Sequence, residues 1–93
     1  MSTLAPESVI ARSPSAVTSE VEGEVMMMNV EQGRYFSLND VASEVWHCLA
    51  QPISFADLVA RIADSYDAAP DAIAADLQKL LADMREREVI EVS

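Results

Sequence analysis

Residues 33–46 read GRYFSLNDVASEVW, and the change of pattern inside this stretch decides the fold. Residues 34–38 place two adjacent aromatic residues in a short run that is typical of a β-strand. Asn39 can then cap a helix, and Asp40 puts a negative charge in its first turn. Apolar residues recur after it at helical spacing, namely Val41, Val45, Trp46 and Leu49. The stretch therefore predicts a strand that leads directly into a helix.

Two further strands are predicted before this stretch. In residues 17–21, Val17, Ser19 and Val21 alternate with polar neighbours, which indicates a half-buried strand. Residues 25–30 are nearly all apolar, which indicates a central strand covered on both faces. Residues 22–24 and 31–33 supply the turns, and Gly33 is free to adopt a positive φ. Short turns between consecutive strands predict an antiparallel meander.

Two more helices are predicted after it. Pro52 ends the first helix, and Ser54 followed by Asp57 resembles a capping box for the second. Pro70 suits the first position of a third helix that runs from about Asp71 to Arg87. The expected apolar stripes are Leu58, Val59, Ile62, Ala63 and Tyr66 on the second helix and Ile73, Leu77, Leu80 and Met84 on the third, with Leu81 beside them.

These elements predict one domain in a chain of 93 residues. The fold class is α+β and winged-helix-like, with a three-stranded antiparallel sheet followed by three helices. We expect residues 16–93 to form this domain. Residues 1–15, with Pro6 and Pro14, read as a flexible N-terminal arm that holds a short extended piece near residues 9–11. The end of the chain, residues 89–92, reads as an extended tail that could pair with another strand or across a two-fold axis.

Composition restricts the possible partners. The formal net charge is −10, from sixteen acidic and six basic residues, whereas nucleic acids and anionic membranes require a basic surface. A winged-helix DNA-binding regulator remains an alternative, although the third helix begins with the acidic sequence DAIAAD. No apolar run approaches the roughly 20 residues of a membrane span. With one cysteine and no signal-peptide pattern, we expect a cytoplasmic protein.

The sequence shows no catalytic set. His47 and Cys48 are adjacent, so on a helix they point about 100° apart and cannot act as a base and nucleophile pair. No second histidine or cysteine exists to complete a metal site. The only glycines, Gly23 and Gly33, cannot form a phosphate-binding loop. We therefore expect no enzyme activity, no metal and no cofactor.

The third predicted strand is the candidate binding element. Its outer side is unpaired in a three-stranded meander, and such an edge can accept a peptide strand. Tyr35 and Phe36 point to opposite faces, and the sequence leaves open which of them meets a ligand. The run of methionines at residues 26–28 either fills the core or offers an adaptable contact surface.

The third predicted helix offers a second element beside its apolar stripe. This flank is formed by Asp76, Lys79, Leu80 and Asp83. One interpretation is a solvated face held by the pairs Asp76–Lys79 and Asp83–Arg87. The other interpretation is one wall of a groove whose second wall is the third strand.

Three stretches together resemble a known family: YFSLNDVASEVWHCL, SFADLVARIADSY and DAIAADLQKLLADMREREVIEV. They resemble the pyrroloquinoline-quinone synthesis D proteins, PqqD, which are also called RiPP precursor peptide recognition elements. The resemblance spans residues 16–92. Its most specific parts are residues 35–39, Trp46, Asp76-Leu77 and Leu80-Leu81.

The resemblance implies a non-catalytic, leader-peptide-binding protein. The precursor peptide would add as a strand beside the third strand, with its apolar side chains in a groove against the third helix. Carried onto this sequence, the site comprises Arg34, Tyr35, Phe36, Ser37 and Leu38 on the strand and Asp76, Lys79, Leu80 and Asp83 on the helix.

The resemblance is slightly stronger to the stand-alone B1 elements of lasso-peptide pathways. This implies a leader peptidase and a cyclase as partners. The alternative is a chaperone that presents its peptide to a radical SAM enzyme in pyrroloquinoline quinone synthesis. Many members have a glycine between the first two helices where this chain has Gln51-Pro52. We expect a monomer or a weak homodimer.

Overall fold

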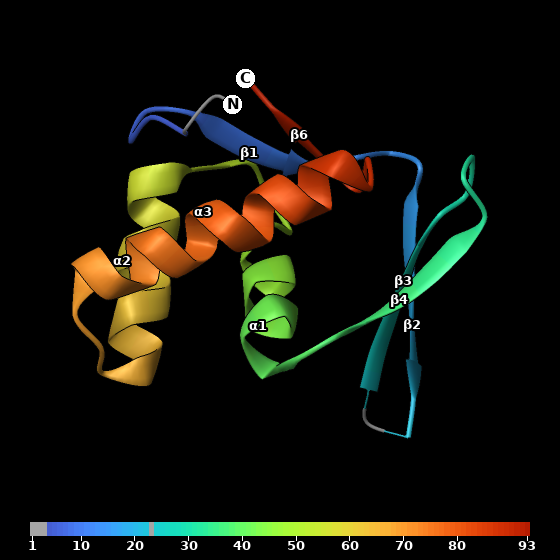
Figure 1. The fold of residues 1–93 in the computed structure, drawn as a ribbon, viewed down its shortest axis with the longest axis horizontal. Coiled ribbons are helices and arrows are strands. Elements are labelled where there is room, and N and C mark those ends of the chain that lie inside the picture. Colours follow the sequence, from blue (N-terminus) through green and yellow to red (C-terminus); the bar gives the residue numbers. More distant parts are fainter. Residues whose placement is uncertain (1–3, 23) are drawn as a thin grey trace.

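The structure contains the predicted meander and the three predicted helices, and it adds a second small sheet (Figure 1). This computed structural model describes residues 4–22 and 24–93, without the side chains of Val21, Arg34 and Phe36. In chain order the elements are β1 (Val9–Arg12), β2 (Ala16–Val21), β3 (Glu24–Asn29), β4 (Arg34–Leu38), α1 (Asp40–Cys48), β5 (Ile53–Ser54), α2 (Phe55–Tyr66), α3 (Pro70–Glu86) and β6 (Ile90–Val92).

The meander is the antiparallel sheet β2-β3-β4. Its second turn is as predicted, because Gly33 has a φ of +66°, a conformation that glycine adopts without strain. In the first turn, Glu22 has a φ of +52°, while the predicted Gly23 lies outside the described residues. Because both turns are short, consecutive strands pair in register along their whole length.

The second sheet has the order β5-β1-β6 and corrects the expectation of a flexible N-terminal arm. Residues 9–12 form β1, which pairs antiparallel with β5 on one side and with β6 on the other. Ile10 is fully buried at 0% exposure, and burial of its side chain holds the strand in place. The predicted C-terminal tail therefore pairs within the same chain, with Ile10 opposite Val92.

The helix boundaries follow the predicted caps. The Asn39 Oδ1 atom accepts a hydrogen bond from the Ala42 amide at 2.8 Å. The Ser54 hydroxyl accepts one from the Asp57 amide at 3.2 Å, and Pro70 occupies the first turn of α3. The two hydrogen bonds satisfy amides that have no partner inside the helix, and Pro70 has no amide hydrogen that would need one. None of the helices in the described residues is long and apolar enough to cross a membrane.

The core lies between the three helices and the two sheets. The fully buried helical residues include Val45, Leu58, Ile62, Leu77, Leu81 and Met84. Two stripe predictions need correction. Tyr66 is 40% exposed rather than buried, and Leu81 takes the core position on α3, while Leu80 is only half-buried beside it. Leu80 therefore lies at the border between core and surface.

The meander is covered on one face only. In β3, Val25, Met27 and Asn29 are buried, whereas Met26 and Met28 are half-buried. The prediction of a strand covered on both faces is therefore wrong. The helices lie to one side of this sheet, which projects from the rest of the molecule and connects to α1 through β4 (Figure 1).

Arg12 joins the end of β1 to α1. Its guanidinium carbon lies 4.4 Å from the centroid of the Trp46 ring, and its Nη2 atom donates a hydrogen bond to the Trp46 carbonyl at 2.7 Å. Trp46 itself is 4% exposed. A cation stacked on a buried indole in this way stabilises the packing of α1 against the rest of the fold.

Candidate functional site

The outer side of β4 is a free sheet edge. β4 pairs with β3 from Val25–Leu38 to Asn29–Arg34, and no strand among the described residues pairs with its other side. Every second residue of an edge strand directs its backbone N–H and C=O groups outward, where another strand can bond to them. The predicted edge, residues 34–38, is therefore confirmed as an edge strand.

The side chains along β4 differ in their surroundings. Tyr35 is 66% exposed, Ser37 is exposed, and Leu38 is 7% exposed in the core. The side chains of Arg34 and Phe36 lie outside the described residues, so their predicted contacts with a ligand stay predictions.

A buried asparagine fixes the turn end of β4. Asn29, at 3% exposure, accepts hydrogen bonds from the amides of Glu31 and Gln32 at 2.9 and 3.1 Å. Its Nδ2 atom donates to the Glu88 carbonyl at 2.7 Å, just after the end of α3. Gln32 adds a 2.6 Å bond to the Glu88 carboxylate. The β3–β4 turn is thereby attached to the C-terminal end of α3.

The other end of β4 is fixed by α1. Leu38 packs in the core, and the next residue, Asn39, caps the helix. The Ser43 hydroxyl also donates a hydrogen bond to the Leu38 carbonyl at 3.4 Å. With both ends held, β4 offers a backbone edge that needs little reordering when a ligand strand binds.

One flank of α3 is already covered by the N-terminal segment. The Gln78 side chain accepts a hydrogen bond from the Leu4 amide at 3.0 Å and donates one to the Leu4 carbonyl at 2.9 Å. Leu80 is two residues further on, about 200° around the helix, and so lies on the opposite flank. Asp76 and Asp83 share that flank with Leu80 at i−4 and i+3 and are exposed.

Lys79 lies on the side of α3 that faces away from the core. It is exposed and lies about 200° around α3 from the buried Leu77, so it points away from the core. The predicted Asp83–Arg87 ion pair is present at 3.1 Å, between partly exposed side chains. Asp76 and Lys79 form no ion pair with each other in the described structure. A surface pair of this kind contributes little to stability, so Asp83 keeps its freedom to contact a ligand.

The two predicted walls of the groove are β4 and the Leu80 flank of α3, and they are connected to the rest of the fold in different ways. β4 leads directly into α1, while its link to α3 runs through Asn29 and Glu88 at one end. That the Leu80 flank and the β4 edge form two walls of one groove therefore stays a prediction.

Sequence reasoning missed the contact between Asn29 and Glu88. The available signal was an asparagine directly before a glycine-containing turn.

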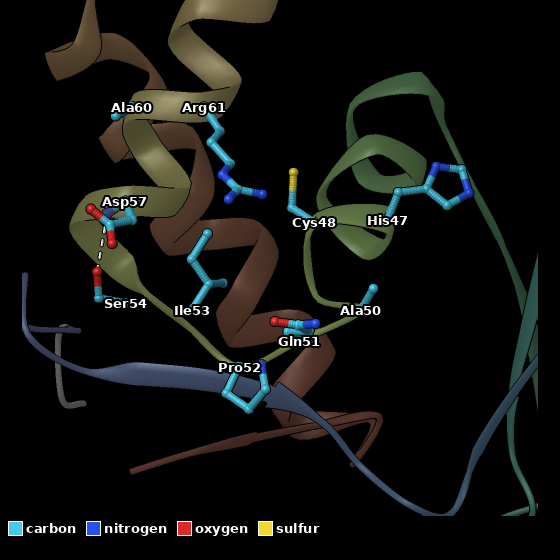
Figure 2. Close-up of a pocket in the computed structure, with 10 residues that line it drawn as sticks. All are labelled: His47, Cys48, Ala50, Gln51, Pro52, Ile53, Ser54, Asp57, Ala60 and Arg61. Atoms are coloured by element: carbon cyan, nitrogen blue, oxygen red, sulfur yellow. Dashed lines mark hydrogen bonds between the residues drawn. The ribbon is translucent and has the colours of Figure 1, made fainter.

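A separate cavity lies between the end of α1 and the start of α2 (Figure 2). Its volume is about 750 Å³, and the side chains of Cys48, Asp57 and Arg61 are among those that line it. Figure 2 shows the Cys48 and His47 side chains pointing away from each other, consistent with the separation of about 100° between adjacent residues of a helix. The histidine therefore cannot take a proton from the thiol in this arrangement.

Tyr66, near the end of α2, has a perturbed ionisation. Partial desolvation and the neighbouring carboxylates of Glu44 and Asp40 raise the pKa of its phenol. The Glu44 carboxylate also accepts a hydrogen bond from the Ser65 hydroxyl, which joins α1 to α2. No group of three or more metal-ligating side chains is found in the described part of the chain.

Comparison with known proteins identifies the family. The family described as Coenzyme PQQ synthesis protein D (PqqD) matches residues 24–90. The chain belongs to the PqqD family. No curated protein matches the sequence.

Two solved structures share the PqqD-family fold over most of the chain. One is TbiB1 in complex with the TbiA(beta) leader peptide, with 25% identity, a TM-score of 0.79 and coverage of 87% of this chain and 94% of that chain. The other is the solution NMR structure of the PqqD truncation of Methylobacterium extorquens PqqCD, described as a functional and stand-alone RiPP recognition element. It has 22% identity, a TM-score of 0.77 and coverage of 95% and 94%. The chain thus has the α+β fold of a RiPP recognition element.

Proposed function

We propose that this protein binds the leader segment of a ribosomally synthesised precursor peptide by adding it as a strand beside β4. The observation that carries this proposal is the free β4 edge, which Asn29 and α1 hold at its two ends. Main-chain hydrogen bonds along such an edge provide affinity with little dependence on sequence, while neighbouring side chains provide specificity. The structural likeness to TbiB1, which was solved with a leader peptide, supports the same interpretation.

The side chains on α3 supply the specificity in this proposal. Leu80 is half-buried on the flank opposite the N-terminal segment and offers an apolar contact for a leader side chain. Asp76 and Asp83 lie on the same flank, and Lys79 lies at its outer rim. The net charge of −10 favours a leader that carries basic residues next to its apolar ones. The strand contacts come from Arg34 to Leu38.

The protein is proposed to present this peptide to enzymes and to perform no chemistry itself. The partners would be a leader peptidase and a cyclase of lasso-peptide biosynthesis, acting in the cytoplasm with a recognition protein that is a monomer or a weak homodimer. The alternative partner is a radical SAM enzyme of pyrroloquinoline quinone synthesis. Reconstituting the protein with each enzyme and the precursor encoded beside it would distinguish the two, because only the cognate enzyme should gain activity.

The binding site is tested by titrating a fluorescent leader peptide from the neighbouring precursor gene. We expect micromolar affinity for the unaltered protein and about tenfold weaker binding for Leu80→Ala, because the truncation removes an apolar contact at the centre of the site. Val92→Ala is the matched control, since it truncates a half-buried aliphatic side chain in the other sheet. Absence of binding at micromolar concentrations to every peptide encoded nearby would contradict the proposal.

Charge reversal tests which flank of α3 faces the peptide. Asp76→Lys and Asp71→Lys change the net charge equally, but Asp71 lies two turns before Gln78 on the opposite flank. We expect only Asp76→Lys to weaken the binding of a basic leader. Equal effects of both substitutions would show that general charge, and not this flank, controls binding.

A further inference from the structure

The exposed face of the meander collects most of the large apolar side chains that the described residues leave in solvent. These exposed side chains are Val17 at 45%, Val30 at 57%, Tyr35 at 66% and Tyr66 at 40%. Three of them belong to the β2-β3-β4 region, and Tyr66 is on α2. Scattered single apolar residues are normal on a protein surface, whereas a cluster marks a contact site.

The strand register places Val17, Met28 and Tyr35 in one row across the sheet. Val17 pairs with Met28, and Met28 pairs with Tyr35, so the three lie side by side across the sheet. The Val30 amide donates a hydrogen bond to the Ser15 carbonyl at 2.9 Å and so continues the β2–β3 ladder beyond Asn29. By strand alternation, Val30 lies on the same face as Met28.

Among the described side chains, this face of the meander does not contribute residues to the hydrophobic core. The opposite face of the meander carries the buried residues Val25, Met27 and Leu38. Met26 and Met28 on the outer face are only half-buried, and the helices lie to one side of this sheet (Figure 1). Methionine is suited to surfaces that adapt to a partner, because its side chain is flexible and polarisable.

The charges around the face indicate its occupant. Glu22 and Glu24 lie at one end and Glu31 at the other, and all three are exposed. A second copy of this chain would bring these like charges together, in addition to a net charge of −10 on each copy. A partner protein with an apolar strip bordered by lysine or arginine would complement the face in both shape and charge.

We propose that the row Val17, Met28 and Tyr35, with Val30, is the docking surface for a processing enzyme whose contact region is apolar and basic-rimmed. This inference rests on the proposed function. A peptide strand added beside β4 would extend the same sheet, and every second side chain of the peptide would join this face next to Tyr35. An enzyme that docks here therefore contacts the recognition protein and its bound peptide together, and it binds the loaded form more tightly.

The test measures enzyme docking and peptide binding separately. The double variant Val17→Lys/Val30→Lys adds positive charge to the face at two residues that the peptide site does not use. The probes are the purified leader peptidase and cyclase encoded beside the precursor, added to the immobilised protein with and without leader peptide. Tyr66→Ser is the control, because it alters an exposed aromatic residue outside the meander.

We expect at least one enzyme to bind the peptide-loaded protein five-fold or more tightly than the empty protein, roughly the lower limit of ordinary coupling. The double variant should bind that enzyme about tenfold more weakly, as for loss of a central contact, with its leader-peptide affinity within about twofold of the original. Tyr66→Ser should change neither quantity.

Three outcomes would overturn the inference while leaving the proposed function intact. In the first, the double variant binds the enzymes as well as the original protein does. In the second, neither enzyme binds the unaltered, peptide-loaded protein. In the third, light scattering shows a dimer that the double variant disrupts, which would assign the face to a second copy. Loss of leader binding in the double variant would reassign the face to the peptide, and failure of the unaltered protein to bind peptide would contradict the proposed function itself.

Discussion

At the scale of single residues, Arg12 shows how a charged side chain can be structural. It stacks on the Trp46 ring and donates a hydrogen bond to the Trp46 carbonyl near the end of α1. Its Nε atom is buried without a hydrogen-bond partner, which offsets part of this gain. The geometry requires the planar guanidinium, because a lysine ammonium cannot stack and donate in the same way.

We therefore expect Arg12→Lys to lower the free energy of unfolding by about 1 kcal/mol and Arg12→Ala by about 2 kcal/mol. Urea denaturation followed by Trp46 fluorescence measures both, since the indole lies in contact with the altered residue. Arg61→Ala on the exposed surface of α2 is the control and should change the value by less than about 0.5 kcal/mol. Equal losses for Arg12→Ala and Arg61→Ala would show that the stacking contributes nothing.

At the scale of elements, the β3–β4 turn combines two roles in one side chain. The Asn29 side-chain Oδ1 atom accepts hydrogen bonds from the backbone amides of Glu31 and Gln32 and so holds the turn. The Asn29 side-chain Nδ2 atom donates to the Glu88 backbone carbonyl and so attaches the turn to the end of α3. The attachment sets the position of the β4 edge relative to the end of α3. The two roles can be separated, because aspartate keeps the acceptor and loses the donor.

We expect Asn29→Ala to destabilise the protein by about 2–3 kcal/mol, because it removes the three hydrogen bonds that this buried side chain makes to the backbone of Glu31, Gln32 and Glu88. Asn29→Asp should keep the turn but release it from Glu88, and so weaken leader-peptide binding about threefold or more. Gln32→Ala, which removes only the exposed bond to Glu88, is the control and should have little effect on either quantity. Calorimetric titration of the leader peptide measures the binding, and unchanged affinity of a folded Asn29→Asp variant would show that the attachment does not position the edge.

At the scale of the whole molecule, the sequence predicts what is local. The turn at Gly33, the caps at Asn39 and Ser54 and the start of α3 at Pro70 were all predicted, because each depends on a few neighbouring residues. The exposed edge of β4 followed from the order of the strands in a meander.

The second sheet and the attachment of β4 depend on contacts between distant parts of the chain. β1 pairs with β6, so the first and last strands lie side by side, and each has four residues or fewer. Such short strands show no periodicity that a sequence pattern can detect. The bond from Asn29 to Glu88 joins residues that are 59 positions apart. For the same reason, the sequence predicted Asp76, Leu80 and Asp83 as site residues on α3. It could not show that they lie on the flank opposite Gln78, because that flank is defined by the contact of Gln78 with Leu4.

The central claim, strand addition at β4, is tested most directly by amide hydrogen exchange measured by NMR with and without bound leader peptide. Alternate amides among residues 34–38 should gain protection of about a hundredfold or more, because new hydrogen bonds form along the free edge. The amides of β2, at the other edge of the same sheet, should exchange at unchanged rates. Saturating peptide that leaves β4 exchange unchanged, or that protects β2 instead, would contradict the account.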